Sequence, residues 1–585
     1  MKKLLIITAL MCCYGLGYSI DNYSKTLVHI DTDIAKPDRN EVFTDTDFNT
    51  SFTRITDAVA DAGTGEEYVG LTYSRFSPLN CDGTKLLLQR ENGWDAAMIY
   101  NATTHALIKI VPRTTVRDGV AGKNLVTHES TEPRWSATNP DLIYFIGSYV
   151  QGDGMKFFSY NCVTDAVTTV HNFSTNFPTG DHILNNVEGS CSDDGRYWAF
   201  MTVSAYNGSV FPMLNYFCYD MQTDSIIGTL TYADYVSAGG TQATLRRANM
   251  VDMSPSGDKM VLHLSRCYDG WYTGDIGTIF DGPHAFDKNL SVASAIKVAI
   301  DETHSGWGYD ANGNELFVSQ NNRNDWIEAR NVLTGETIDI IYHGDLGWSN
   351  GMHFSRMPLL SSCTGWVLVS TYRGDGENNT SWGDDQLFML ELVDKDIQTP
   401  RVYRLGHTWN KYNDYRSEGF AAMSQFGDKL WFNAKWWDGD VTECYEMNMP
   451  DVFGGTPIDP PDPEPDPEST NYTQDADVLF TLVMDADTNP LTDSSPNELN
   501  ATKKAATEPL FNSLDIPKNF SSGCVEFDGV DDYIYVSSAI AIGQGDFSAV
   551  FWIKPDIEIS TDTRFLYLDD EFSISISTKT SIGVE

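Results

Sequence analysis

Short apolar runs alternate with polar turns through most of the chain, and one phrase recurs. In its clearest copy, a Ser77-Pro78 step and an Asp82-Gly83 turn precede the apolar run at residues 85–88. Apolar runs of this length between Gly, Asn and Asp turns predict β-strands rather than helices. Similar phrases begin near Trp135, Cys191, Met253, Asp310, His353 and Met423.

These seven copies recur at a mean spacing of roughly 58 residues, slightly longer than the usual propeller period, and long loops explain the excess. Each copy offers about four short strands, so the pattern predicts a seven-bladed β-propeller. The strand-like segment at residues 52–57 precedes the first copy. We expect it to complete the last blade, because an open ring leaves sheet edges exposed. The alternative is a β-sandwich whose turns match this repeat only by coincidence.

A proline-rich segment, PIDPPDPEPDP at residues 457–467, follows the repeats. Proline at nearly every second position favours an extended polyproline II conformation, and the acidic residues between the prolines repel one another. The segment therefore predicts a semi-rigid spacer. We expect a propeller at residues 40–450, a linker at 451–470 and a second domain at 471–585.

Composition narrows the class of partner. The 585 residues include 39 Lys and Arg against 82 Asp and Glu, a net charge of −43. Phosphate binding needs a basic face, so this balance argues against a nucleic-acid partner. Aromatic residues make up 12% of the chain, and long helical patterns are nearly absent. The predicted fold class is all-β: a seven-bladed propeller joined by the linker to a partial β-sandwich.

The N-terminus has a charged start at residues 1–3, an apolar run at 4–11 and small residues at 17–19. This order is typical of a secretory signal peptide, here residues 1–19, and the run is too short to span a membrane. No other segment is apolar enough to span one. We therefore expect a secreted, extracellular or periplasmic protein. Lipid anchoring at Cys12 or Cys13 is disfavoured, because no small residue precedes either cysteine.

Eight cysteines remain after residue 19, and none forms a Cys-x-x-Cys pair. Several lie in or beside strand-like runs, where a buried free thiol is expected. One or two disulfides stay open for an exported protein.

Polar residues just ahead of the repeated phrases are the candidate functional residues. In a propeller the inner strands line a central channel, and the loops that enter them crowd one face, where ligands bind. The alternative is that these groups satisfy backbone amides at strand starts. The residues are Glu132, Glu188, Asn249, Asp252, His304, His353 and Glu418.

Several segments of the propeller region resemble secreted seven-bladed propellers related to oligogalacturonate and ulvan lyases. They are Glu-Pro-Arg-Trp-Ser at 132–136, His304-Ser305, the strand at 365–371, Arg-Leu-Gly-His-Thr at 404–408, and Tyr415 with Glu418. The resemblance implies β-elimination on uronic-acid polysaccharides. Such a reaction needs an Arg or metal ion on the carboxylate, a His or Tyr base, and a Tyr or His acid. A second histidine some twenty residues after His128, implied by ulvan lyases, is absent, and only Tyr149 stands there.

The resemblance implies a set of histidines, a tyrosine and an arginine around the channel. The expected catalytic residues are His128, Tyr235, Arg247 and His304. The expected substrate-binding residues are Glu132, Glu188, Glu418 and Arg404. The expected metal ligands are His353 and His407, or alternatively His263, Cys267 and His284, whose ligand types suit zinc. The divalent ion stays open among zinc, manganese and calcium. His182, ahead of the third phrase, is a further candidate.

The second domain carries its own resemblance. Asp-Ser-Ser-Pro-Asn at 493–497, the run at 524–536 and the run at 547–555 resemble laminin-G-like, concanavalin A-type jelly rolls of secreted bacterial proteins, with Pro496 in place of the usual glycine. This implies a glycan- or surface-binding module. Because that family's domain is typically longer, we expect this one to be C-terminally incomplete.

Three functions follow from these patterns. The first is a secreted carbohydrate-active enzyme that cleaves an acidic polysaccharide by β-elimination. The second is a non-catalytic propeller that binds an extracellular glycan or protein. The third is sugar hydrolysis by Glu132 and Glu188, which needs a separation of roughly 5–10 Å. A polysaccharide or cell-surface glycan is the expected partner, and the oligomeric state stays open.

Overall fold

The computed structural model describes residue 25, most of residues 34–450, Phe453, and the backbone of seven strands beyond residue 500. Gaps in residues 34–450 fall at 91–95, 113, 118–119, 125–132, 186–187, 265–272, 301, 348–349, 361, 374–380, 411–414 and 438. The chain divides into two units, Met1–Pro461 and Asp462–Glu585. Each unit is described by itself.

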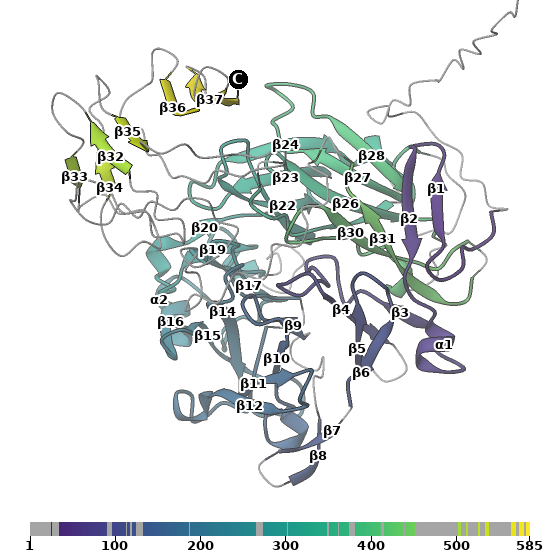
Figure 1. The fold of residues 1–585 in the computed structure, drawn as a ribbon. Helices are drawn as coiled ribbons and strands as arrows, with labels where there is room; N and C mark the ends of the chain where they lie inside the picture. Colours follow the sequence, from purple (N-terminus) through teal and green to yellow (C-terminus); the bar gives the residue numbers. More distant parts are fainter. Residues whose placement is uncertain are drawn as a thin grey trace, which may run out of the picture. The chain divides into compact units, whose positions relative to one another are not determined.

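Five separate four-stranded antiparallel sheets form the second to sixth blades of the first unit (Figure 1). Within each sheet, the strands follow one another in chain order. The second blade is β9 (Arg134–Trp135), β10 (Leu142–Ile146), β11 (Lys156–Asn161) and β12 (Val167–Asn172). The third is β13 (His182–Leu184), β14 (Tyr197–Val203), β15 (Met213–Asp220) and β16 (Ser225–Thr231). The fourth is β17 (Val251–Met253), β18 (Lys259–Leu262), β19 (His284–Asp287) and β20 (Ile296–Lys297). The fifth is β21 (Glu302–Tyr309), β22 (Glu315–Asn321), β23 (Trp326–Asn331) and β24 (Thr337–Tyr342). The sixth is β25 (Asn350–Phe354), β26 (Trp366–Arg373), β27 (Gln386–Glu391) and β28 (Val402–His407).

The ring closes through a nine-stranded sheet that contains the first and last blades. The first blade is β3 (Tyr68–Gly70), β4 (Lys85–Arg90), β5 (Ala96–Asn101) and β6 (Leu107–Ile110). The last is β29 (Ala422–Met423), β30 (Lys429–Ala434), β31 (Thr442–Asn448) and β2 (Thr50–Arg54), with β1 (Val42–Asp45) added outside β2. β2 pairs antiparallel with β31, with Phe52 opposite Met447, as predicted for the N-terminal segment. Five sheets and these two groups make seven blades among the described residues, so the predicted propeller fold is confirmed.

Few elements lie outside the blades. A hairpin of β7 (Thr114–Arg117) and β8 (Val120–Asn124) follows the first blade. The helices are α1 (Ala58–Ala62), α2 (Tyr232–Ser237) and α3 (His343–Leu346). The described part of this unit also contains five 3₁₀ turns: η1 (Tyr149–Gln151), η2 (Phe173–Thr175), η3 (Thr273–Asp275), η4 (Val292–Ser294) and η5 (Tyr415–Ser417). Among the described residues, every helix falls short of the length and apolar character that crossing a membrane requires.

The recurring phrase folds as the turn between the first two strands of a blade. In the clearest copy Gly83 has φ 74°, a left-handed conformation that glycine adopts without steric cost. The carboxylate of Asp82 accepts a hydrogen bond from the backbone N–H of Thr84 at 3.0 Å, which closes the turn. The glycine recurs in the same conformation in four further copies, as Gly195, Gly257, Gly313 and Gly427.

Buried apolar side chains gather between neighbouring blades. Met201 and Tyr216 of the third blade, for example, share one cluster with Met253 and Leu262 of the fourth. Each blade thus buries both faces against its neighbours, as stacked sheets require. Because the apolar side chains pack between blades, the axis of the ring is left to the polar residues of the first strands. Six cysteines among the described residues are free thiols: Cys81, Cys162, Cys191, Cys218, Cys363 and Cys444. Of the three in or beside strand-like runs, Cys162 and Cys218 are buried as predicted, and Cys191 is half-buried.

The described backbone of the second unit is entirely β. β32 (Ala501–Lys504) pairs with β35 (Tyr533–Val536), and β33 (Leu510–Asn512) pairs with β34 (Cys524–Glu526). β36 (Thr563–Leu568), β37 (Phe572–Ser577) and β38 (Ser581–Val584) form a meander. The predicted signal peptide and the proline-rich segment lie outside the described residues. The jelly roll and the domain boundaries stay predictions.

Candidate functional site

The first strands of the blades bring charged side chains together across the ring. Arg75, which follows β3, donates to the carboxylate of Asp252 on β17 and to the hydroxyl of Ser305 on β21, the latter at 2.6 Å. Arg356, which follows β25, donates to Asp193 at 2.8 Å. These contacts join the first blade to the fourth, and the sixth to the third. They therefore span the axis.

Asp252 is the centre of this axial network. Besides Arg75, it accepts from the indole N–H of Trp307 and from the backbone N–H of Ser190, both at 2.8 Å, and an Arg356 nitrogen lies 3.8 Å away. Burial would raise the pKa of Asp252, but the charges of Arg75 and Arg356 outweigh it and hold the pKa below its ordinary value. Arg75 and Asp252 are each 1% exposed, so the network closes the channel at this level.

A histidine cluster is formed by the fifth, sixth and seventh blades. His353 on β25 has its Nε2 2.8 Å from the Oε2 of Glu418, which follows η5. The ring of His304 on β21 lies against His353, with centroids 4.3 Å apart and planes 37° apart. Tyr372 stacks on His353 at 5.3 Å. We call His304, His353, Tyr372 and Glu418 the axial centre.

The imidazole of His353 is neutral at neutral pH. It is fully buried, and burial lowers its pKa to about 3. Because a carboxylate accepts, the contact with Glu418 places the ring proton on Nε2. Nδ1 is then the unprotonated nitrogen, and it has no hydrogen-bond partner among the described residues. His304, in contrast, is only half-buried, so it is the imidazole of the pair that reaches the surface.

Of the other expected catalytic residues, the structure describes Tyr235 and Arg247. Tyr235 lies in α2, is fully buried, and donates from its hydroxyl to Asp275 at 2.6 Å. Burial and that carboxylate raise its pKa. Arg247 is exposed on the segment that enters β17. His128 lies outside the described residues.

The expected substrate-binding residues are also spread apart. Glu418 belongs to the axial centre. Glu188 is half-buried in the segment that follows β13, beside Gly189, whose carbonyl accepts from Arg134 at 2.9 Å. Glu132 lies outside the described residues, so the Glu132–Glu188 separation is not described. Arg404 is 1% exposed on β28, far from the first strand of its blade.

His407 also lies at the outer edge of the sixth blade, at the end of β28. Its Nδ1 is 2.9 Å from the Oδ2 of Asp45 on β1, and its backbone N–H donates to the same oxygen at 2.9 Å. The strand of His353 and the strand of His407 are three strand spacings apart, about 14 Å. The structure therefore does not bring these two expected metal ligands together.

One group of three metal-binding side chains occurs among the described residues. Ligand atoms of Asp45, Asp47 and His407 all lie within 4.8 Å of one another. Oxygen and imidazole donors suit a divalent ion. The guanidinium of Arg404 is already near this group: burial lowers the pKa of Arg404 to about 10, and the two aspartates oppose that shift. We call Asp45, Asp47, Arg404 and His407 the closure seam, because they join the sixth blade to the added strand of the last.

The alternative metal ligands do not face one another. Leu262 pairs with His284 across β18 and β19, so the next residue, His263, points to the opposite face of the sheet. The Nδ1–H of His284 donates to the carbonyl of Gly282 at 2.9 Å, and burial lowers the pKa of His284 to about 4. Cys267 lies outside the described residues.

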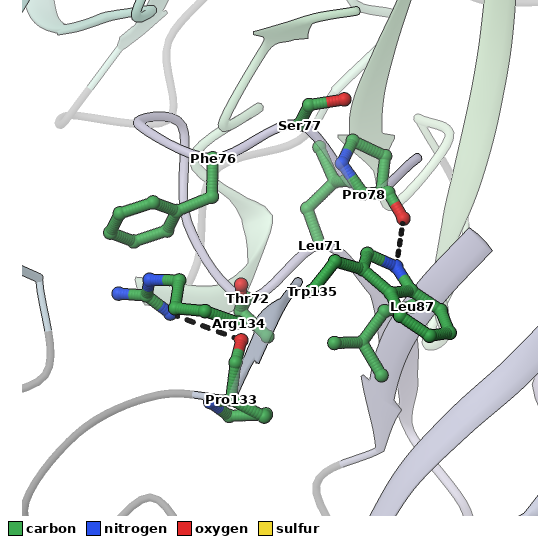
Figure 2. Close-up of a pocket in the computed structure, with 9 residues that line it drawn as sticks. All are labelled: Leu71, Thr72, Phe76, Ser77, Pro78, Leu87, Pro133, Arg134 and Trp135. Atoms are coloured by element: carbon green, nitrogen blue, oxygen red, sulfur yellow. Dashed lines mark hydrogen bonds between the residues drawn. The ribbon is translucent and has the colours of Figure 1, made fainter. Parts of the chain in front are cut away.

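A small cavity lies between the first and second blades (Figure 2). Its volume is about 20 Å³, enough for about one water molecule. The Arg134 guanidinium sits 3.2 Å from the ring centroid of Phe76, and the Trp135 indole donates to the carbonyl of Pro78 at 2.9 Å. A sugar ring does not fit here.

Comparison with known proteins adds little. No family model and no curated protein matches the chain. Similar solved structures include an oligogalacturonate lyase of Vibrio parahaemolyticus, at 11% identity and TM-score 0.46, covering 71% of this chain and 97% of that one. Another is an oligogalacturonate lyase in complex with manganese, at 10% identity and TM-score 0.44, covering 72% and 98%. Likeness at this level carries no argument about activity, and the propeller rests on the chain's own sheets.

Proposed function

We propose that the propeller is a carbohydrate-active enzyme that cleaves an acidic, uronic-acid polysaccharide by β-elimination at the axial centre. The observation that carries the proposal is the half-buried His304 lying on a neutral, carboxylate-bonded His353. An imidazole that reaches the surface is suited to remove a proton near neutral pH.

His304 is the base of the proposed reaction. The C–H bond next to the sugar carboxylate breaks and its proton passes to His304. The electron pair forms a carbon–carbon double bond, and the glycosidic C–O bond breaks. His353 is fully buried and does not touch substrate. It acts as a positioning residue, since its contact with Glu418 fixes the ring on which His304 packs.

The leaving oxygen takes a proton from Tyr372. This tyrosine is half-buried near the end of β26, at the same end of the sixth blade as the start of β25. Exposed Arg247 and Arg323 enter β17 and follow β22, both at this end of the ring, and can offset the substrate's charge. The described residues of the axial centre do not form a three-ligand group, so the reaction is derived without a metal ion.

The proposal is tested by the ultraviolet absorbance of unsaturated uronate after incubation with pectin fragments, ulvan or a neutral glycan. We expect a rise with an acidic glycan, and a rate at least 100-fold lower for His304→Ala, the usual loss for a general base. His171→Ala is the matched control, because His171 lies on an outer strand and contacts Asp224 at 2.6 Å. No rise with any acidic glycan contradicts β-elimination.

A second function is a non-catalytic propeller that binds an extracellular glycan or protein. The observation that favours it is the closed axis: the Arg75–Asp252 network leaves the described part of the ring without a deep channel. Binding without absorbance change supports this function. In either case we propose a secreted protein whose second domain is a glycan- or surface-binding module, on the sequence resemblance alone.

A further inference from the structure

Two loops on the second and third blades bring four aromatic rings into contact. Tyr149 in η1 meets Phe211, in the loop between β14 and β15, at 5.4 Å, and Phe211 meets Tyr206 at 5.3 Å. His182, at the start of β13, stacks under Tyr149 at 4.7 Å and 25°. The rings therefore form one contiguous surface. We call Tyr149, His182, Tyr206 and Phe211 the ring platform.

The ring platform is bordered by exposed apolar side chains. Tyr206 is 57% exposed; Val150, next to Tyr149 in the chain, and Val210, next to Phe211, are 71% and 56% exposed. Leaving several large apolar groups in water at one place is unfavourable, and such patches mark interaction sites. The exposed apolar side chains therefore indicate that the ring platform binds a ligand with an apolar face.

Exposed charge is sparse in both loops: the first contains Asp153, which is buried, and the second contains no charged residue. Residues 148–152 and 204–212 contain no Lys, Arg, Asp or Glu, although the chain carries a net charge of −43. An acidic polymer is repelled by most of such a surface. A loop pair with little exposed charge is a place where the neutral face of that polymer can approach.

Contacts on the buried side of the ring platform fix the positions of His182 and Tyr149. His182 is 6% exposed, and its Nδ1 lies 2.9 Å from the carboxylate of Asp181. Gly154 packs against His182 and Tyr149 so closely that a Cβ has no room there. Rings fixed in this way lose little conformational entropy when a ligand binds.

The ring platform lies at the same end of the ring as the axial centre. His182 pairs with Val203 at the end of β14, and Val203 pairs with Met213 at the start of β15, so both loops lie where the blade's first strand begins. His304 lies near the start of β21, the first strand of the fifth blade. The first strands of a propeller run in the same direction along the axis, so both features face one side.

We propose that the ring platform binds a sugar ring of the polysaccharide whose cleavage we assign to the axial centre. This inference rests on the proposed function for the identity of the polymer. The C–H face of a pyranose is apolar and packs on aromatic rings, while its hydroxyl groups reach exposed polar side chains such as Asn207 and Ser209. Because residues 148–152 and 204–212 carry no charged side chain, the platform recognises the neutral face of the sugar, and the carboxylate is left to the axial centre.

The test measures binding without turnover, in the His304→Ala background, by affinity electrophoresis with pectin fragments and ulvan. We expect Tyr206→Ala to weaken binding about 5- to 10-fold, the size of one lost aromatic contact. Val150→Asp, which adds charge to an exposed position, should weaken it by a similar factor. The matched control is Tyr232→Ala, a tyrosine that is 41% exposed on α2.

Three results overturn the inference. The first is that both variants bind the glycan within twofold of the His304→Ala protein, and the second is that the His304→Ala protein binds no glycan. The third is that the variants keep glycan binding but lose a dimer, measured by light scattering. The last would assign the platform to a second copy of this chain. The two proposals fail separately. Binding that depends on Tyr206 without any absorbance rise in the wild type removes the lyase and keeps the platform. An absorbance rise with binding insensitive to Tyr206 does the reverse.

Discussion

The axial centre and the closure seam both place a buried histidine against a carboxylate. His353 contacts Glu418 at 2.8 Å, and His407 contacts Asp45 at 2.9 Å. Neither histidine is exposed, and in each ring the other nitrogen lacks a hydrogen-bond partner among the described residues. As isolated pairs the two are nearly equivalent.

Their surroundings differ. In the closure seam, Asp45 also accepts the backbone N–H of His407, and Arg404 lies near it, so the carboxylate ties two strands together. In the axial centre, a second imidazole with surface exposure, His304, lies on the buried one. The second imidazole that reaches solvent is what makes the axial centre the candidate active site, whereas the pair in the closure seam joins two strands.

Acid should lower the free energy of unfolding through His353, on the axial side of this comparison. The pKa of His353 falls from 6.5 to about 3 on burial, so below about pH 6.5 the unfolded chain takes up a proton that the folded chain refuses. The free energy of unfolding is therefore full above pH 6.5 and falls toward pH 3. The slope is at most about 1.4 kcal/mol per pH unit, or about 3 kcal/mol between pH 6.5 and 4.5.

Urea unfolding at several pH values measures this slope. His353→Gln should flatten it whatever its effect on stability at neutral pH. His171→Gln, on an outer strand, is the control and should keep the wild-type slope. Equal slopes in wild type and His353→Gln would contradict the burial of a neutral imidazole.

Removing one carboxylate charge should lower turnover when the change is in the axial centre, and should leave turnover unchanged when it is in the closure seam. Glu418→Gln keeps an acceptor for His353 but loses the charge that orients it, so we expect turnover to fall about 10- to 100-fold. Asp45→Asn makes the same chemical change in the closure seam and should leave turnover unchanged. The measurement is the unsaturated-uronate absorbance under saturating substrate. Equal losses in both variants would mean that the axial pair has no special role.

The repeat predicts much of this arrangement, but it does not predict how far each residue lies from the axis of the ring. Polar residues ahead of the phrases predicted His304, His353 and Glu418, and the structure brings these three together. The resemblance to oligogalacturonate lyases groups His407 with His353 as metal ligands. His407 ends the fourth strand, however, while His353 lies in the first. Counting strands within each repeat would have separated them.

Other features depended on contacts that no local pattern carries. Tyr235 precedes the fourth phrase, but a capping box of Thr231 and Asp234 starts α2, which turns the tyrosine into the core between blades. Tyr372 lies on β26, one strand after His353, and the repeat does not predict it, because it lies after the phrase and not ahead of it. Arg75 meets Asp252 across the ring, 177 positions later in the chain. Such a pairing follows only from closing the ring.

The smallest expected effect concerns the closure seam itself. Asp45 accepts two hydrogen bonds from His407 and lies 1% exposed, while β2 next to it holds Phe52 in the core of the last blade. Asp45→Asn keeps the shape and one acceptor oxygen but loses the charge near Arg404. We expect the free energy of unfolding to fall by about 1 kcal/mol, the scale of one charge-assisted hydrogen bond partly replaced. Urea unfolding at neutral pH measures this, and Asp396→Asn, an aspartate outside the seam whose side chain is 80% exposed, is the matched control. A different result would contradict this role: Asp45→Asn unfolds like the wild type, and added divalent ions stabilise the wild type but not the variant. The seam would then be a metal site and not a strand-to-strand contact. The reason is that an ion bound only by the folded state adds stability that rises with its occupancy.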